Sequence, residues 1–247
     1  MRGSLVASLG TALFCAAFFV AYTIQGITGF AGNMFAMPAG IHTLGMEQSV
    51  AVLNAMGAMA CGLLAVLNWR HIDWRQLGRI VAVMSPFMLV GIWIDGVASL
   101  RALLLGYGVL IVGVGAYNLA VKRQRILPAW AQWGLLVGAG LVQGMFVSGG
   151  ALLVVYAVQK IQGKLAFRAT LSMVWAVLNL AYALIAWGQG SFTAEVQGVV
   201  LMCVPLAAVA TVGGNWIGSR ISKAAFLKMA YVVLVGIGVA LVGSSWA

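Results

Sequence analysis

The sequence predicts an all-α polytopic membrane protein built from two inverted-topology repeats. Of the 247 residues, 63% are hydrophobic and only 7% are charged, whereas about 25% are charged in a soluble domain. The hydrophobic runs approach the roughly 20 residues that a helix needs to cross a bilayer. They lack the alternation of polar and apolar residues that is typical of membrane β-barrels. A soluble fold and a β-barrel are therefore excluded.

Eight apolar segments follow one another along the chain. They are 5–45, 47–69, 77–95, 100–120, 131–160, 166–188, 195–218 and 224–245. The first and the fifth contain the interruptions Gln25-Gly-Ile-Thr-Gly-Phe-Ala-Gly32 and Gln143-Gly-Met-Phe-Val-Ser-Gly-Gly150. Non-helical backbone at membrane depth is tolerated only where protein or a water-filled cavity satisfies it. Corresponding breaks in the two halves of a membrane protein point to the substrate site of a transporter.

The distribution of basic residues predicts that both broken segments double back. Four clusters hold three Lys or Arg residues each, and only Arg2 and Arg101 of the 14 lie elsewhere. If each broken segment crossed once, the clusters would divide evenly between the two sides, against the positive-inside rule. If each is a hairpin, all four clusters share the cytoplasmic face and both termini lie outside. The clusters are Arg70, Arg75 and Arg79; Lys122, Arg123 and Arg125; Lys160, Lys164 and Arg168; and Arg220, Lys223 and Lys228.

The two halves of the chain also align with each other. Each half begins with a glutamine-glycine pair at its break, and later features recur in the same order. The matching pairs are Gln25-Gly26 with Gln143-Gly144, Trp69 with Trp187, Pro86 with Pro205, Trp93-Ile94 with Trp216-Ile217, and Gly113-Val-Gly115 with Gly236-Ile-Gly238. The charge argument starts the first half outside and the second half inside. The repeats are therefore inverted, which is an architecture of secondary transporters.

These observations predict three parts of the chain. A first transmembrane repeat covers 1–120, a basic cytoplasmic linker covers 121–130, and a second, inverted transmembrane repeat covers 131–247. Each repeat would hold a broken hairpin and three further helices, giving about 8–10 membrane helices in total. Most tryptophans fall near predicted span ends, as an interfacial belt requires. Trp175 is the exception, and we expect it to pack inside the protein rather than to line a substrate path.

The residue content excludes most catalytic chemistry. Gly163-Lys164 lacks the earlier glycine and the following hydroxyl residue of a P-loop. His42 and His71 form no metal-binding pattern, so we expect no metal, no cofactor and no enzyme activity. Asp95 and Glu195 lie at span ends, which argues against a proton relay of buried carboxylates. The basic residues that give the net charge of +10 lie mostly in short loops. We therefore expect a lipid bilayer as partner and no nucleic acid.

The two breaks are the predicted substrate site. A helix that begins after each break aims N–H groups and a partial positive charge at the midplane. Neutral amides and hydroxyls without fixed charge suit a small anion. A simpler alternative is that the glycines only let helices pack and the amides only cap freed backbone. The predicted site residues are Gln25, Gly26, Thr28, Gly29, Gly32 and Asn33 at the first break, Gln143, Gly144, Ser148, Gly149 and Gly150 at the second, and Asn54, Ser172 and Asn179 in the helices that follow.

Three stretches resemble a known family of permeases. They are Ile27-Thr-Gly-Phe-Ala-Gly-Asn-Met-Phe-Ala-Met-Pro38, Gly144-Met-Phe-Val-Ser-Gly-Gly-Ala-Leu-Leu-Val-Val155 and Gly213-Gly-Asn-Trp-Ile-Gly-Ser-Arg220. The first two are similar to the paired glycine-phenylalanine-glycine stretches of the sulfite exporter TauE/SafE family, and the third to its late glycine-rich helix end. The second stretch departs from the pattern at Ala151, where a third glycine is common, and Tyr156 stands where proline is usual. The resemblance implies transport of sulfite, sulfonates or related organosulfur anions across the cytoplasmic membrane.

The sequence thus predicts a secondary transporter for a small anion, which the resemblance suggests is sulfite or an organosulfur acid. The two half-sites would meet at the midplane and open alternately to either side. An inside-negative potential expels a bare anion with about 2.3 kcal/mol per charge per 100 mV, which favours export. An anion channel of the same fold, an uptake permease for another carboxylate or oxyanion, and a homodimer remain open alternatives.

Overall fold

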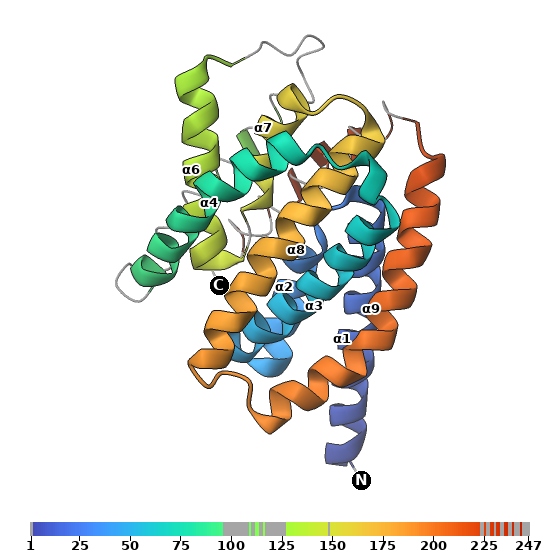
Figure 1. Cartoon of the computed structure of the whole chain (residues 1–247). Helices are drawn as coiled ribbons and strands as arrows, with labels where there is room; N and C mark the ends of the chain where they lie inside the picture. Colours follow the sequence, from blue (N-terminus) through green and yellow to red (C-terminus); the bar gives the residue numbers. More distant parts are fainter. Residues whose placement is uncertain are drawn as a thin grey trace. The chain divides into compact units, whose positions relative to one another are not determined.

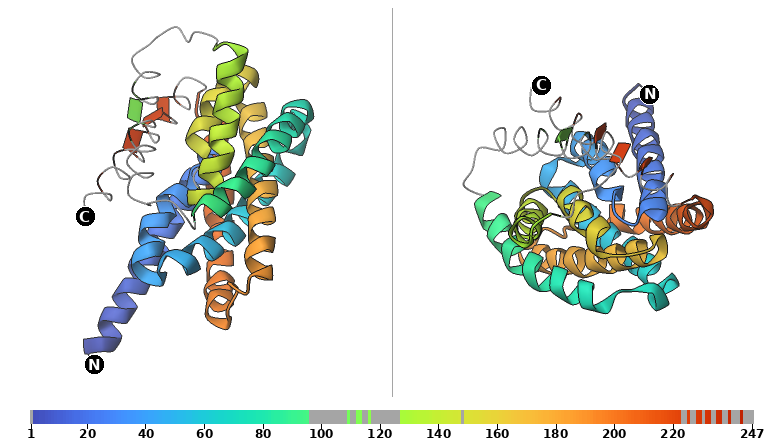
Figure 2. Two further views of the ribbon diagram at one scale, coloured as in Figure 1. Left: turned by 90° about the vertical axis from the view of Figure 1, so that its left-hand side faces the viewer. Right: turned by 90° about the horizontal axis from the view of Figure 1, so that it is seen from above.

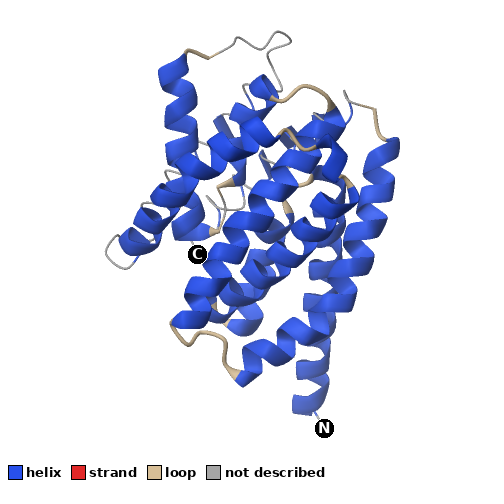
Figure 3. Cartoon of the chain, viewed as in Figure 1, coloured by secondary structure: helices blue, strands red, loops and turns tan. Residues whose placement is uncertain are grey.

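The computed structural model describes most of the chain, and all regular structure in the described residues is helical (Figure 3). This confirms the predicted all-α class. The expected segments 100–120 and 224–245 and the start of the linker lie mostly outside the described residues. The residues described are 2–95, 109, 112–113, 116, 127–147, 149–222, 225, 228–229, 231–232, 235–236, 239 and 243.

Eight α-helices and one short 3₁₀ helix lie in the described residues (Figure 1). Four of the α-helices, α3, α4, α8 and α9, are long and apolar enough to cross a membrane. The bounds are α1 Arg2–Thr28, α2 Gly32–Leu44, α3 Met46–Leu67, η1 Trp69–His71, α4 Trp74–Asp95, α6 Ala129–Phe146, α7 Gly150–Lys160, α8 Lys164–Gly188 and α9 Ala194–Arg220. Both glycine-rich stretches interrupt helices as predicted, one between α1 and α2 and the other between α6 and α7.

The chain forms two compact units, and each takes residues from both predicted repeats. Unit 1 consists of 1–72 and 168–220, and unit 2 consists of 73–167 and 221–247. Unit 1 therefore contains α1, α2, α3, α9 and α8 from Arg168 onward, whereas unit 2 contains α4, α6 and α7. Sequence symmetry and compact packing thus divide this chain differently.

An apolar core holds the helices of unit 1 together. Phe14, Phe18 and Tyr22 on α1 pack against α2, α3 and α9, and the rings of Phe18 and Tyr22 stack with centroids 4.2 Å apart. Leu53 and Met56 bring α3 into the same core. Since each of these side chains is almost fully buried, the first break is anchored to a rigid group of four helices.

Unit 1 has two ends of different charge. At one end, Gln48 Nε2 donates to Glu195 Oε2 over 3.3 Å, which joins the start of α3 to the start of α9. At the other end, Asn68 Nδ2 donates to Asn215 Oδ1 over 3.4 Å, which joins the end of α3 to the last turns of α9. We name these the acidic end, with Glu47 and Glu195, and the basic end, with Arg70, Arg168 and Arg220. Arg70, Arg168 and Arg220, from three of the four basic clusters, thus lie at one end of unit 1.

Glycines bring α1 and α9 into close parallel contact. A Cβ at Gly26 would lie 2.5 Å from the carbonyl oxygen of Thr211 and 2.8 Å from the Cα of Gly214, and a Cβ at Gly218 would lie 2.9 Å from the carbonyl oxygen of Ile27. The contacts therefore move forward along α1 and α9 together, so the two helices run in the same direction. Since α9 runs from the acidic end to the basic end, α1 ends near the basic end and α2 returns toward the start of α3. The first broken segment is a hairpin, as predicted.

Unit 2 repeats this packing with the corresponding helices. Gly144 of α6 lies directly against the backbone of Met88 and Gly91 in α4, and a Cβ at Gly140 would lie 2.7 Å from the carbonyl oxygen of Met84. The helices α4 and α6 run side by side and in parallel (Figures 1 and 2). In the predicted alignment Gly144 corresponds to Gly26 and Gly91 corresponds to Gly214. Each hairpin thus packs on a helix of the other predicted repeat.

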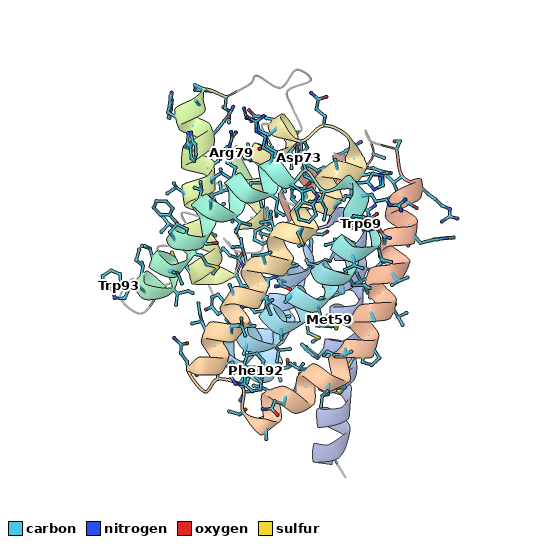
Figure 4. The ribbon with its side chains drawn as sticks, viewed as in Figure 1. Met59, Trp69, Asp73, Arg79, Trp93 and Phe192 are labelled. Atoms are coloured by element: carbon cyan, nitrogen blue, oxygen red, sulfur yellow. The ribbon has the colours of Figure 1, made fainter. Side chains whose placement is uncertain are left out.

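The ends of the helices carry exposed aromatic rings. Trp93 lies at the far end of α4 from Asp73 and Arg79, and Trp69 lies just after α3 (Figure 4). Arg220 stacks over the ring of Trp216 with its Cζ 3.6 Å from the ring centroid. Seven tryptophans are at least half exposed, as a membrane-interface belt requires, whereas Trp246 lies outside the described residues. The seven are Trp69, Trp74, Trp93, Trp130, Trp133, Trp187 and Trp216.

Candidate functional site

The first break begins at a left-handed glycine. The φ angle of Gly29 is 86°, a conformation that costs glycine little and a β-branched residue much more. The N–H of Gly29 donates to the carbonyl oxygen of Gln25 over 2.6 Å, which closes the last turn of α1. The chain then turns and enters α2 at Gly32.

Gln25 binds both sides of the break. Its Oε1 accepts a hydrogen bond from the N–H of Gly32 over 2.6 Å, and its Nε2 donates to Cys61 Sγ on α3 over 2.7 Å. The side chain is almost fully buried. Both of its polar atoms are therefore engaged with protein, and Gln25 fixes the start of α2 relative to α1 and α3.

Thr28 supplies a second cap for the freed backbone. Its hydroxyl donates to the carbonyl oxygen of Ile24 over 2.8 Å and accepts from the N–H groups of Phe30 and Ala31 over 3.3 and 3.4 Å. A buried amide that lacked such a partner would be costly in a membrane. For Gln25 and Thr28, the observed contacts match the simpler alternative, in which polar side chains cap the break.

Asn33 and Asn179 bring amide groups to the middle of unit 1. A Cβ at Gly57, near the centre of α3, would lie 2.7 Å from Asn33 Nδ2 and 2.6 Å from Asn179 Nδ2. The hydroxyl of Tyr22 donates to Asn33 Oδ1 over 2.9 Å. Gly57 thus leaves the space that these two amides fill. The start of α2 lies at the depth of the centre of α3, so the first break reaches mid-height in the unit.

One face of α8 follows the break. Arg168, Ser172, Trp175 and Asn179 are spaced by four, three and four residues, which places them on one side of a helix. All four are buried. Ser172 Oγ lies 3.5 Å from the carbonyl oxygen of Gly29, as donor to it. We name these four residues the polar face of α8.

Arg168 corrects two predictions. The sequence placed it in a basic loop cluster and described the first break as free of fixed charge. In the structure Arg168 lies inside α8 with only 3% of its surface exposed. Its Nη2 donates to the carbonyl oxygen of Gly26 over 2.5 Å and to Asn215 Oδ1 over 2.9 Å. The charge count treats every basic residue near a span end alike, and could not distinguish one that turns into the protein.

The remaining predicted residue of unit 1 is Asn54. It is fully buried on α3, one turn before Gly57. Its Nδ2 donates to the carbonyl oxygen of Val50 over 2.8 Å, while its Oδ1 has no hydrogen-bond partner among the described residues. Asn54 therefore lies on the stretch of α3 that the amides of Asn33 and Asn179 approach. No hydrogen bond from Asn54 to the break is described.

The second break, in unit 2, is built on the same plan. Gln143 Oε1 accepts a hydrogen bond from the N–H of Gly149 over 3.2 Å, next to Gly150, where α7 begins. Val147 occupies the position that corresponds to Gly29, and its φ angle of 52° is also left-handed. Its N–H donates to the carbonyl oxygen of Gln143 over 3.0 Å. Ser148, a predicted site residue, lies outside the described residues.

The chain that contains these two breaks is similar in sequence to known proteins. The sequence pattern of the sulfite exporter TauE/SafE family matches residues 13–241, which covers nearly the whole chain. The chain belongs to this family. No solved structure matches it.

Two relatives of the chain have descriptive names. It is 28% identical over 229 residues to the probable sulfite/organosulfonate exporter TauE of Cupriavidus necator, covering 88% of each chain. It is 27% identical over 183 residues to the probable inner membrane transporter protein TsaS of Comamonas testosteroni, covering 73% of this chain and 77% of that one. The first relative is thus described as an exporter and the second as an inner membrane transporter.

The structure shows how two of the three family-like stretches meet. The late stretch of the TauE/SafE pattern contributes Gly214, Asn215 and Gly218, and all three contact the first break or Arg168. A Cβ at Gly218 would lie 3.0 Å from both Cζ and Nη2 of Arg168. This glycine-rich helix end therefore lets α9 approach the end of α1 and the guanidinium of Arg168.

Sequence reasoning missed four residues that contact the first break. Tyr22, Cys61 and Asn215 carry no spacing signal of their own. Arg168 did carry one, because it stands four residues before Ser172 and eleven before Asn179, on the same helical face. Among the described residues, no group of His, Cys, Asp and Glu could hold a metal ion. The missed residues are Tyr22, Cys61, Arg168 and Asn215.

Proposed function

We propose that this chain is a secondary transporter that moves a small anion, sulfite or an organosulfonate, out of the cell by alternating access. The substrate would bind at the first break, among the amide and hydroxyl groups that α2, α3 and α8 bring together. Membership of the TauE/SafE family supports membrane transport. The printed name of the Cupriavidus necator relative supports the substrate class.

The observation that carries the proposal is the meeting of Asn33 and Asn179 over Gly57. Amide N–H groups at the centre of a transmembrane unit provide hydrogen bonds to an oxyanion without the full cost of a dry charged site. The start of α2 at the same depth adds the partial positive charge of a helix N-terminus. Neutral donors of this kind favour an acceptor-rich ligand over a cation.

The energetics of an anion favour outward movement. A membrane potential that is negative inside drives each negative charge outward, with about 2.3 kcal/mol per 100 mV. Uptake of the same anion would require a coupling ion. Within the described residues, Glu47 and Glu195 lie at the acidic end of unit 1 and are not placed to bind a cation at the break. Export therefore requires the fewest components.

An anion channel of the same fold is the second candidate. The two mechanisms differ in one measurable property, because only a carrier exchanges internal for external substrate in counterflow. The tight closure of the first break by Gln25 and Thr28 favours a carrier, since a channel would need a continuous polar path.

The test is anion efflux from proteoliposomes that contain the purified protein. Sulfite, thiosulfate, sulfoacetate and sulfate are compared at equal concentration. We expect sulfite or sulfoacetate to move fastest, and we expect Asn33→Ala and Asn179→Ala to lower the rate strongly. The matched control is Gln197→Ala, which removes an amide from the exposed start of α9. If none of the four anions moves, the proposed function is wrong.

A further inference from the structure

Two buried side chains of unit 1 carry N–H donors that have no hydrogen-bond partner in the described part of the chain. Among the described residues, no acceptor faces Nε or Nη1 of Arg168, or Nε1 of Trp175. The two residues are only 3% and 5% exposed, and both belong to the polar face of α8. An arginine side chain and an indole can donate hydrogen bonds and cannot accept them. Any group that satisfies these atoms must therefore be an acceptor.

The charge of Arg168 is also not balanced by its protein partners. Its two hydrogen-bond acceptors are the carbonyl oxygen of Gly26 and the amide oxygen of Asn215, both uncharged. Glu47 and Glu195 lie at the acidic end of unit 1, the opposite end from Arg168. A buried charge is expensive unless it is paired. An unbalanced buried cation is therefore a strong candidate for binding a negative charge.

The guanidinium lies at the first break, about three turns of α8 before Asn179. It contacts Gly26 at the end of α1, and Ser172 on the next turn of α8 contacts Gly29. Gly218 on α9 leaves the space in which Cζ and Nη2 lie. The polar face of α8 then leads from Arg168 past Trp175 to Asn179, beside Asn33 and Gly57. Arg168 thus stands at the basic end of a row of donors that reaches the middle of the unit.

We propose that Arg168 binds the negative charge of the transported anion. This inference rests on the proposed function and narrows the substrate to an oxyanion with at least two acceptor oxygens, such as sulfite or a sulfonate. The planar guanidinium presents several N–H donors in fixed directions and stays protonated, which suits such groups better than the single ammonium of lysine. Trp175 offers the next donor along the same face.

The test compares charge and geometry at one position. Sulfite efflux from proteoliposomes gives KM and maximal rate for wild type, Arg168→Gln, Arg168→Lys and Arg220→Gln. Loss of a charged hydrogen bond predicts that Arg168→Gln raises KM at least about tenfold, with a smaller rise for Arg168→Lys. Arg220→Gln removes the same charge from the exposed surface of the basic end, so its KM should stay within about twofold of wild type.

A second readout separates anion binding from a purely structural role. Sulfite should raise the melting temperature of the detergent-purified wild type, and should raise it much less in Arg168→Gln. Asn215→Ala removes the side-chain partner of Arg168 and keeps the charge, so sulfite should still stabilise it. If Arg168 only braces α1 against α9, Arg168→Gln and Asn215→Ala will lose stability alike while both keep the wild-type response to sulfite. That result overturns the inference.

Each remaining outcome also decides. If Arg168→Gln does not fold, Arg168→Lys and Gly218→Ala replace it. The methyl group added by Gly218→Ala presses on the guanidinium of Arg168. An unchanged KM for sulfite in both variants overturns the inference. Wild-type protein that transports sulfite, with KM unaltered in Arg168→Gln, contradicts the inference and leaves the proposed function standing. Wild-type protein that sulfite stabilises through Arg168, without moving any anion, contradicts the proposed function and supports the binding site.

Discussion

Gln25 Oε1 accepts a hydrogen bond from the N–H of Gly32 over 2.6 Å, so a side chain of α1 caps the start of α2 across the first break. The second break has the same relationship between Gln143 and Gly149. A glutamine at the same position of each repeat thus performs the same structural task. The glutamine-glycine pairs on which the predicted internal repeat rests thus share this capping.

Removal of this cap should destabilise the protein. Gln25→Leu leaves the buried N–H of Gly32 without its acceptor, which costs about 1–3 kcal/mol. We expect a clearly lower melting temperature of the purified protein in detergent. Gln48→Leu is the matched control, because Gln48 is only partly buried and its bond to Glu195 lies at the exposed acidic end, and it should change the melting temperature little. Equal stability of Gln25→Leu and wild type would show that the cap is dispensable.

Gly29 and Val147 should show what a side chain costs at a left-handed backbone position. Both have positive φ angles, 86° and 52°, at corresponding positions. Val147→Gly and Val147→Ala both lose buried apolar surface, because Val147 is only 5% exposed. Only glycine also relieves backbone strain of about 1–3 kcal/mol, so Val147→Gly should be at least as stable as Val147→Ala. Gly29→Val adds strain and brings a Cβ within 3.0 Å of the carbonyl oxygen of Arg168. Thermal unfolding checks both expectations. Gly29→Val should melt well below wild type, and a Val147→Gly that is clearly less stable than Val147→Ala would contradict the shared geometry.

The close contacts of α1 with α9 and of α6 with α4 should be equally intolerant of added volume. Gly26→Ala and Gly144→Ala each press a methyl group against the backbone of the neighbouring helix, and overpacking of this kind costs about 1–3 kcal/mol. Gly213→Ala, one residue from Gly214, meets nothing within 4 Å and should be neutral or slightly stabilising. Reduced yield and melting temperature for the first two variants alone would support the duplicated packing. A normal Gly144→Ala would contradict it.

Much of the fold could be predicted from the sequence, because in a membrane the hydrophobic length and the loop charges restrict the helices strongly. The break after Thr28, the hairpin of α1 and α2 and the exposed tryptophans such as Trp93 all follow from such patterns. The packing of α1 on α9 could not be predicted in this way. It depends on contacts between Gly26 and Gly214, far apart in the sequence, and small residues indicate that helices approach without naming the partner.

The candidate site was predicted by residue type better than by role. Gln25 and Thr28 are at the break as expected, yet their polar atoms bind the backbone and Cys61. Asn33, Ser172 and Asn179 are brought to the break as the sequence suggested. Arg168 was assigned to the surface because a charge near a span end usually lies in a loop. Only the contacts of the folded chain show that it turns toward Gly26.

The predicted orientation has a direct test in unit 1. Two variants, Arg220→Cys and Ser191→Cys, each add one cysteine to the chain. Each variant is treated with a membrane-impermeant maleimide in intact cells and in inverted vesicles. The positive-inside rule predicts that Ser191→Cys reacts in intact cells and that Arg220→Cys reacts only in inverted vesicles. Wild type, in which Cys61 and Cys203 are buried and Cys15 is partly exposed, gives the background. Labelling of both positions from the same side would contradict the predicted topology.

The central claim is carrier-mediated movement of a small anion, and counterflow tests it most directly. Proteoliposomes loaded with unlabelled sulfite are diluted into a trace of radiolabelled sulfite. We predict transient accumulation of label above its equilibrium level in wild-type vesicles, because only a carrier couples the two fluxes. Asn33→Ala removes a proposed binding group, so accumulation should be much weaker with this variant. Label that merely equilibrates, or enters no faster than in protein-free vesicles, would contradict the account.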